Sequence, residues 1–202
     1  MKVKHCAASI VFAALAAFGG KAQAVFIGDN DIIPSTSLAS SSGFTIDEIA
    51  DGITSDNPPF NGFASNSSSG AIALDLVGNF DLTDFILWND INVFLEGIKD
   101  FRLDFFDENN FFISSSVVFQ APLGQLASQT YSFSPVPCVS SVDLVVLNSH
   151  PDTFNRIEIR EVAFEGEVCI PEPTSVMLFA AGALAFITFG SVRKKRGSRA
   201  MS

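Results

Sequence analysis

An uncharged apolar run near the C-terminus, Val176 to Val192, sets the first limit on how this chain can fold. As a helix it rises about 26 Å, and Thr174 and Ser175 bring it level with the roughly 30 Å of a hydrocarbon core. A basic cluster follows directly: Arg193, Lys194, Lys195 and Arg196. Because basic residues flanking a membrane helix stay in the cytoplasm, we predict a transmembrane helix over about residues 175–192. The basic tail, residues 193–202, would lie inside and the preceding chain outside.

The N-terminus has the composition of an export signal. Lys2 and Lys4 precede a short apolar run, Cys6 to Phe18, and the small-x-small sequence Ala22-Gln23-Ala24 follows it. This order is typical of a secretory signal peptide. We predict a signal helix in residues 1–24, export through the Sec pathway, and cleavage between Ala24 and Val25.

Pro171, Glu172 and Pro173 stand just before the predicted membrane helix. Together with the helix and the basic cluster, over residues 171–202, they resemble the PEP-CTERM sorting signal. The resemblance implies that an exosortase, a membrane cysteine transpeptidase of Gram-negative-type bacteria, recognises the motif and processes the chain near it. The helix would then be a transient anchor in the inner membrane, and the product would reach the cell surface or the extracellular space. An ordinary anchor with a chance Pro-Glu-Pro is the alternative.

The chain between these segments, residues 25–170, is long enough for one domain. It contains four basic and 21 acidic residues, a net charge of −17. Such a charge repels phosphate backbones, so we expect no nucleic-acid partner. It suits a soluble exported protein and equally one that binds divalent cations.

Two cysteines, Cys138 and Cys169, remain once Cys6 leaves with the signal peptide. An even pair in an oxidising compartment favours a disulfide. Two unpaired thiols are the alternative, since Cys169 lies at the exit of the domain.

Short apolar segments with period-2 alternation recur after Gly70, whereas residues 27–66 are rich in loop-forming residues. In residues 98–106, for example, Phe101, Leu103 and Phe105 share one face and Arg102 and Asp104 the other. The segments are Ala71–Val77, Phe85–Trp88, Ile98–Phe106, Phe111–Phe119, Tyr131–Phe133, Val142–Leu147 and Arg156–Phe164. This spacing predicts an all-β, antiparallel sandwich or barrel with the phenylalanines in its core.

The last segment contains a change of phase. Ile157 and Ile159 predict an inward residue at position 161, which is Glu161, but Val162 and Phe164 continue in the opposite phase. Either a β-bulge shifts the register near Arg160-Glu161, or a carboxylate points inward, or both.

Several of these segments, in their order, resemble the discoidin or galactose-binding-like domain over about residues 44–166. The segments are Ala50-Asp51-Gly52, Ala73-Leu74-Asp75-Leu76, Phe85-Ile86-Leu87-Trp88-Asn89, Gly97-Ile98-Lys99-Asp100-Phe101 and residues 157–166. The resemblance implies an eight-stranded jelly-roll sandwich of the kind found in many carbohydrate-binding modules.

That resemblance also implies one structural calcium ion near an end of the sandwich. Carried over, its ligands would be the side chains of Asp51 and Glu161, the backbone oxygens of Ile49 and Ile53, and Asp56 through its backbone or carboxylate. The family usually has Thr where Asp56 stands, and it often has a Trp shortly after the loop, which is absent here. Asp-Gly is also a common turn dipeptide, so Asp51 has an ordinary alternative role.

No catalytic constellation is visible in the domain. Its single histidine, His150, precedes a proline in a polar run, and we expect it in an exposed loop. One histidine gives neither a Ser-His-Asp arrangement nor a zinc cluster, and there is no phosphate-binding loop. We therefore expect a non-enzymatic surface or matrix protein that binds glycans or extracellular polysaccharide. A purely structural matrix protein without a specific ligand is the alternative.

Overall fold

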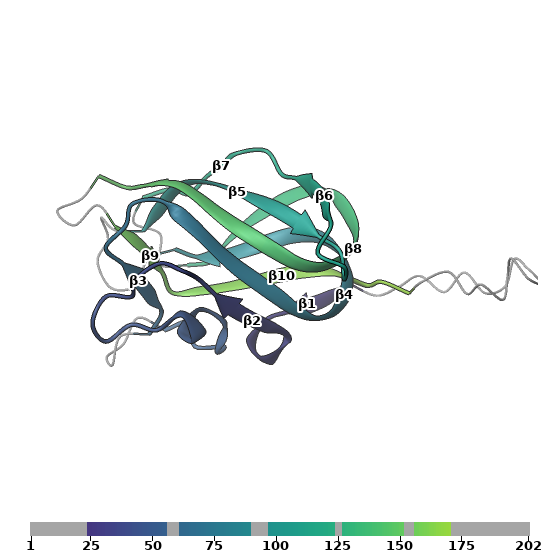
Figure 1. Ribbon diagram of the computed structural model, residues 1–202, viewed down its shortest axis with the longest axis horizontal. Coiled ribbons are helices and arrows are strands. Elements are labelled where there is room, and N and C mark those ends of the chain that lie inside the picture. The colour runs from purple at the N-terminus through teal and green to yellow at the C-terminus, as the bar shows by residue number, and fades with distance from the viewer. Residues whose placement is uncertain (1–23, 56–60, 90–96, 124–126, 152–155, 171–202) are drawn as a thin grey trace, which may run out of the picture. The chain divides into compact units, whose positions relative to one another are not determined.

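The computed structural model describes residues 24–55, 61–89, 97–123, 127–151 and 156–170. These residues form ten strands and two short 3₁₀ helices (Figure 1). In chain order they are β1 (Val25–Ile27), η2 (Asp29–Asp31), β2 (Ile32–Ser35), η3 (Ile46–Ala50), β3 (Phe63–Ser65), β4 (Gly70–Trp88), β5 (Ile98–Phe106), β6 (Phe112–Ser115), β7 (Phe119–Gln120), β8 (Gln129–Ser149), β9 (Ile157–Ile159) and β10 (Glu161–Val168).

Two long antiparallel strands, β4 and β8, organise the sandwich because each contributes to both of its layers. Residues 70–75 of β4 pair with residues 141–146 of β8, and residues 84–87 pair with residues 129–132. The register shifts three times between Asp75 and Asp84, where the paired strands bend. The first layer contains β1, β10, the end of β4 and the start of β8, and the second contains β2, the start of β4, the end of β8, β5, β6 and β7.

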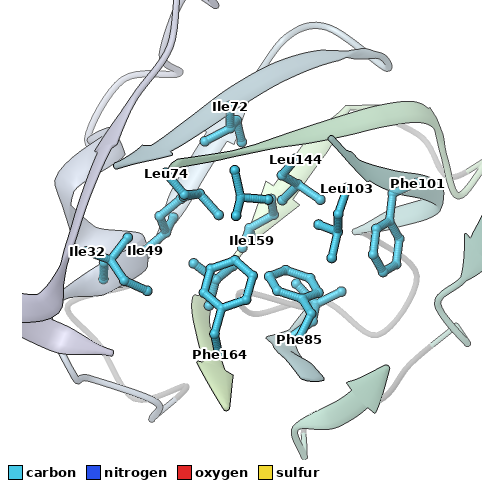
Figure 2. Close-up of a cluster of buried hydrophobic side chains, with 14 of the residues drawn as sticks. Ile32, Ile49, Ile72, Leu74, Phe85, Phe101, Leu103, Leu144, Ile159 and Phe164 are labelled. Carbon is cyan, nitrogen blue, oxygen red and sulfur yellow. The ribbon is translucent and has the colours of Figure 1, made fainter. Parts of the chain in front are cut away.

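Aromatic contacts join the two layers across the core (Figure 2). The ring of Phe85 in β4 lies 5.7 Å from that of Phe101 in β5 and 5.2 Å from that of Phe164 in β10. Phe101 also meets the ring of Tyr131 in β8 edge to face, at 5.0 Å. Each fully buried phenylalanine contributes on the order of 1.5–3 kcal/mol relative to an exposed one. The core is therefore the main source of stability, as the alternation predicts.

The expectation for the phenylalanines holds for most described positions but not for all. Phe101 and Phe105 are buried in β5, as predicted. Phe26, Phe111 and Phe112, however, are 60%, 69% and 59% exposed. Phe112 lies in the edge strand β6, where its side chain is outside the space between the layers, so the prediction that it belongs to the core was wrong.

The phase change in the closing segment reflects a change of pairing partner. β9 pairs with β3, and β10 pairs with β4, and Arg160 lies between them with its backbone nitrogen bonded to the oxygen of Trp88 at 2.8 Å. Because the chain passes between two sheets here, every residue from Ile157 to Phe164 is buried. The strand breaks at Arg160 rather than bulging, and the register shift in β10 comes later, between Glu165 and Gly166.

The predicted targeting segments lie outside the described residues. The signal peptide up to residue 23, the sorting motif Pro171-Glu172-Pro173, the membrane helix and the basic tail all belong to this part. Among the described residues, no helix has both the length and the apolar character needed to cross a bilayer. Val25, the predicted first residue of the mature chain, begins β1 and pairs with Gly166.

Candidate functional site

The turn that carries Asp51 begins at a short, well-capped helix. Thr45 and Glu48 form a capping box at the start of η3, and Ile49 and Ala50 are buried beneath it. The helix ends at Asp51, and Gly52 follows with a φ of +80°, a left-handed conformation that glycine adopts without steric cost. The Asp51-Gly52 pair therefore reverses the chain direction, and the backbone N–H of Gly52 faces another segment.

That other segment is the start of β10. The backbone nitrogen of Gly52 donates a hydrogen bond of 3.1 Å to Oε1 of Glu161. Glu161 is only 3% exposed, and its other oxygen, Oε2, is buried without a hydrogen-bond partner in the described part of the chain. An unpaired buried carboxylate oxygen is costly unless a cation or donor reaches it.

A second hydrogen bond connects this loop, residues 52–54, to the strand break. Arg160, which is also buried, donates from its guanidinium to the backbone oxygen of Thr54 at 3.3 Å. The two residues of the strand break, Arg160 and Glu161, thus fasten the loop of residues 52–54 to the sandwich. Sequence reasoning finds Glu161 from the phase of its strand but gives no sign of the contact with Thr54.

Asn61 lies at the centre of the same loop. Its side-chain nitrogen is 3.2 Å from the backbone oxygen of Glu48, 3.2 Å from Oδ1 of Asp51 and 3.1 Å from the backbone oxygen of Ile53. Oδ1 of Asp51 also accepts the backbone N–H of Ile53 at 2.9 Å. Three oxygens thus converge on one point, which the amide of Asn61 occupies.

We call Asp51, Gly52, Asn61 and Glu161 the carboxylate clasp. Burial raises the pKa of Glu161 to about 8, and the negative charges of Asp51 and Asp29 add to this effect. The Asp29 carboxylate lies beside Gly52, since a side chain added there would meet its atoms at 3.5–3.7 Å. The clasp thus gathers negative charge around a buried acid, a setting that a bound cation would stabilise.

The predicted calcium ligands lie in different parts of this region. Glu161 bonds to the backbone of Gly52, the residue after Asp51, and the oxygen of Ile53 faces the same amide as Asp51. Ile49 is buried in η3, and Asp56 lies outside the described residues. In the described chain, the group of three ligand-type side chains whose atoms lie within 4.8 Å is elsewhere, at Asp81, Cys138 and Cys169. Because these cysteines are bonded to each other, that group offers no metal site.

A disulfide joins Cys138 at the bend of β8 to Cys169 after β10, with the two Cα atoms 5.2 Å apart. Both backbone nitrogens are also fixed. That of Cys138 donates to Oδ1 of Asp81 at 2.8 Å, and that of Cys169 donates to the oxygen of Asn79 at 2.8 Å. The disulfide therefore ties the end of β10 to the bend of β8, and it does so just before the chain reaches the predicted sorting motif.

His150 does not lie in an exposed loop, so that prediction was wrong. It is 8% exposed, and its Nε2 lies 2.9 Å from the backbone oxygen of Ala121. Its backbone nitrogen bonds to the oxygen of Gly97 at 3.0 Å. The residue thus links three segments as a structural element.

A groove of about 460 Å³ opens between β6 and the first part of β8. Its lining consists of one core phenylalanine, residues 113–117 and residues 132–137. Every side chain in this lining is apolar or a serine hydroxyl. We call it the side groove, since it lies where the edges of the two layers face each other.

Known proteins resemble this chain in fold but not closely in sequence. No protein-family model and no curated protein sequence matches it. Among solved structures, the family 32 carbohydrate-binding module of Clostridium perfringens NanJ in complex with galactose matches with a TM-score of 0.57 and 9% identity. The match covers 71% of this chain and 99% of that one.

Two further solved structures show the same arrangement. One is a Clostridium perfringens family 32 module in complex with GalNAc-β-1,3-galactose, with a TM-score of 0.57, 14% identity, and coverage of 69% of this chain and 99% of that one. The other is an F5/8 type C domain from Bacteroides fragilis, with a TM-score of 0.55, 12% identity, and coverage of 68% and 92%. The predicted fold class is therefore confirmed: the described domain is an all-β, antiparallel jelly-roll sandwich of the discoidin-like, galactose-binding-like kind.

Proposed function

We propose that this chain is a non-enzymatic glycan-binding module of an exported protein. The observation that carries the proposal is the fold shared with modules solved in complex with galactose and GalNAc-β-1,3-galactose, at nearly full coverage of those modules. The strongly acidic composition of the domain agrees with an exported, soluble protein. Its ligand would be a glycan of the extracellular polysaccharide.

The proposal includes a location, which rests on the sequence alone. The signal peptide, the Pro171-Glu172-Pro173 motif and the basic-flanked apolar run support Sec export, a single-pass inner-membrane stage with the domain outside, and processing by an exosortase. N-terminal sequencing of the exported protein should begin at Val25. A full-length copy that stays soluble in the cytosol with an intact N-terminus would remove this part of the proposal.

We further propose that the carboxylate clasp holds one structural calcium ion. Glu161 fits this role because its buried Oε2 has no partner among the described residues, and Asp51 supplies a second hard oxygen ligand. Backbone oxygens of the turn, among them those of Ile49 and Ile53, and Asp56 from outside the described residues would complete the set. When bound, the ion would neutralise the buried charge and fasten the loop to β10. The ligand atoms named here are all oxygens, so the site would suit calcium rather than zinc.

A glycan array probed with the full chain, with calcium and with a chelator, tests the proposed function. We expect binding to a defined set of sugars. If no glycan binds in either condition while the protein is folded, the glycan-binding proposal fails and a purely structural matrix role takes its place.

A further inference from the structure

We propose that the side groove is the glycan site and that its ligand is an uncharged oligosaccharide. This inference rests on the proposed glycan-binding function and adds the place of binding and the chemical class of the sugar. The groove volume, about 460 Å³, falls within the range of about 300–1,000 Å³ typical of small-molecule sites. Such sites combine an apolar floor with a few placed polar groups, and both are present here.

The floor of the groove is aromatic. Phe105 comes from the core of the second layer, and its ring lies 5.0 Å from that of Phe133 in β8. Phe133 is half-buried, so part of its ring remains available at the groove surface. Pyranose rings carry apolar C–H faces that pack well on such surfaces, while their hydroxyl groups need hydrogen bonds at the edges.

Serine hydroxyls supply those hydrogen bonds on both walls. Ser114 pairs with Phe105 across β6 and β5, so its side chain shares the inward face with that ring. Ser134 is exposed on the opposite wall. Neither hydroxyl bonds to another described residue, so each is free to donate to and accept from a sugar.

The hydroxyl protons of two other serines are already used in hydrogen bonds. Ser115 donates to Asp104, and Ser132 donates to Asp84, at 2.5 Å in each case. These two serines share the outer faces of their strands with Asp104 and Asp84, so they help to fix the walls and do not face a ligand in the groove.

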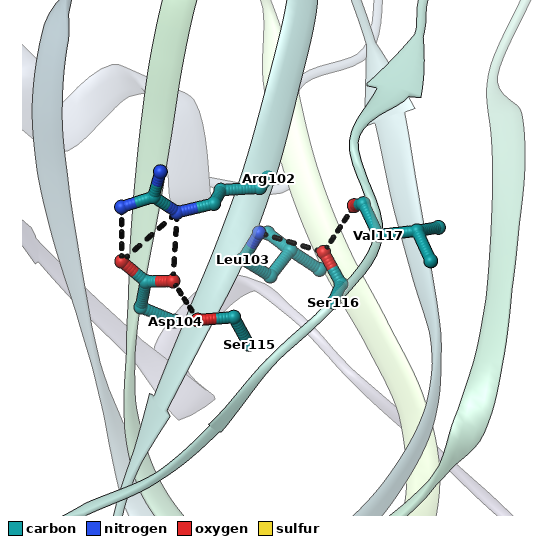
Figure 3. Close-up of polar contacts among 6 residues, drawn as sticks. All are labelled: Arg102, Leu103, Asp104, Ser115, Ser116 and Val117. Carbon is teal, nitrogen blue, oxygen red and sulfur yellow. Dashed lines mark hydrogen bonds and ion pairs between the residues drawn. The ribbon is translucent and has the colours of Figure 1, made fainter.

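The β6 wall is also fixed in position (Figure 3). Arg102 holds Asp104 with three N–H···O contacts of 3.0–3.3 Å. Next to it, the nitrogen of Leu103 donates to the hydroxyl of Ser116 at 2.9 Å, and the nitrogen of Ser116 donates back to the oxygen of Leu103 at 2.8 Å. A wall that is already ordered loses little conformational entropy when a ligand binds.

The chemistry of the walls argues against a peptide ligand. An extended peptide that added a strand along this part of β8 would meet Pro135 and Pro137, which have no backbone N–H to donate. A sugar uses hydroxyl contacts and ring packing, and it does not need those backbone donors.

Charge argues against an acidic sugar. The domain carries a net charge of −17, and Asp84 and Asp104 stand directly behind Ser132 and Ser115. No guanidinium is in the described lining, and that of Arg102, in the strand next to β6, is already paired with Asp104. Uronates and sulfated sugars would therefore be repelled, whereas neutral hexoses and N-acetylhexosamines would not.

The test uses the full chain in a detergent without a sugar headgroup. The best neutral oligosaccharide on a glycan array is chosen as the probe, and its affinity is measured by calorimetry for wild type, S134Y, S114A and S35Y. Ser35 is exposed in β2 outside the groove lining, so S35Y adds the same side chain elsewhere. We expect S134Y to weaken binding at least about tenfold and S114A about threefold to tenfold, with S35Y unchanged.

The outcomes separate the two proposals. If wild type binds the oligosaccharide and S134Y binds it equally well with an unchanged melting temperature, the groove is not the site, and the glycan-binding function stands. If wild type binds no glycan, the function itself fails. Equal or tighter binding of a polyuronate by wild type would overturn the assignment to uncharged sugars.

Discussion

The backbone nitrogen of Gly52 donates to Oε1 of Glu161 over 3.1 Å, across 109 residues of sequence. This bond joins the turn after η3 to the first residue of β10. It satisfies only one of the two oxygens of a buried carboxylate. Glu161 therefore makes the stability of the loop sensitive to protons and, under the calcium proposal, to that cation as well.

The first prediction concerns pH in the absence of calcium. Since the pKa of Glu161 is about 8 in the folded protein against a usual value of 4.5, the folded chain binds more protons than the unfolded chain between these values. The contribution of Glu161 is therefore fully present below about pH 4.5 and is lost as the pH rises through 8. The loss is at most about 1.4 kcal/mol per pH unit. Urea unfolding at several pH values measures it.

The variant E161Q isolates this effect from the other carboxylates. Asp100, whose pKa is lowered mainly by its hydrogen bond from Asn148, acts in the opposite direction and loses stability as the pH falls. The difference between wild type and E161Q cancels such contributions, and it should favour E161Q progressively from pH 5 to pH 8. The exposed E165Q serves as the control. Parallel pH profiles for wild type and E161Q would contradict the prediction.

The second prediction concerns calcium. At a concentration 100 times its dissociation constant, a bound ion adds about 2.7 kcal/mol of stability. For a domain of this size, that corresponds to a rise in melting temperature of about 5–10 °C. Calorimetric scans of the full chain with calcium and with a chelator should show this rise for wild type and lose it in E161Q and D51N. A chelator that leaves the wild-type melting temperature unchanged at neutral pH would rule out the site.

The third prediction concerns the bridge between Cys138 and Cys169. It closes a loop with a sequence separation of 31, which corresponds to about 3–4 kcal/mol of stability in the chain-entropy account. C169S should lower the guanidinium midpoint by a corresponding amount, and C138S should act similarly. Addition of a reductant should affect wild type and leave the double variant unchanged. Equal midpoints for oxidised wild type and the double variant would show that the bridge contributes nothing.

Much of the fold could be predicted because its core strands alternate strictly. In β5, Phe101, Leu103 and Phe105 face inward as their spacing indicates. The alternation fails where β4 and β8 bend between layers. Residues 78–81 of β4 contain Gly78, Asn79 and Asp81, so the sequence suggests two strands where the structure has one. At a bend neither face of the strand is buried throughout, so the sequence shows no period-2 alternation there.

The early strands were missed for a related reason. β1, β2 and β3 lie within or next to a stretch rich in loop-forming residues, and each has only three or four residues. Strands this short show too little alternation to be recognised. They form because longer strands pair with them: β10 pairs with β1, and β4 pairs with β2.

The carboxylate clasp was predictable only in part. Glu161 disturbs the phase of its own strand, which is a local signal. Asn61, by contrast, acts on oxygens from three residues of a folded loop. His150 is buried because Ala121 and Gly97 reach it from distant segments. Contacts of this kind leave no pattern in the sequence.

The last prediction concerns Gly166, at the register shift of β10. A Cβ at this position would lie 2.5 Å from the backbone oxygen of Asp81 and 3.1 Å from the Cα of Leu82. Because both are backbone atoms of a buried strand, they cannot rotate away as a side-chain end would. We expect G166A to lower the free energy of unfolding by about 3 kcal/mol, in line with the overpacking of a dense interior.

G43A provides a comparison for this substitution. The φ of Gly43 is +93°, and a Cβ there would meet no atom within 4 Å, so G43A costs about 1–2 kcal/mol through left-handed backbone alone. Gly166 has no positive φ, so the cost of G166A in urea unfolding itself measures the close approach of β10 to β4. That approach is what brings Glu165 and Glu161 onto their partners in β4. A cost for G166A no greater than that for G43A would mean that the strands separate easily at this point, and that the clasp is positioned from the η3 side alone.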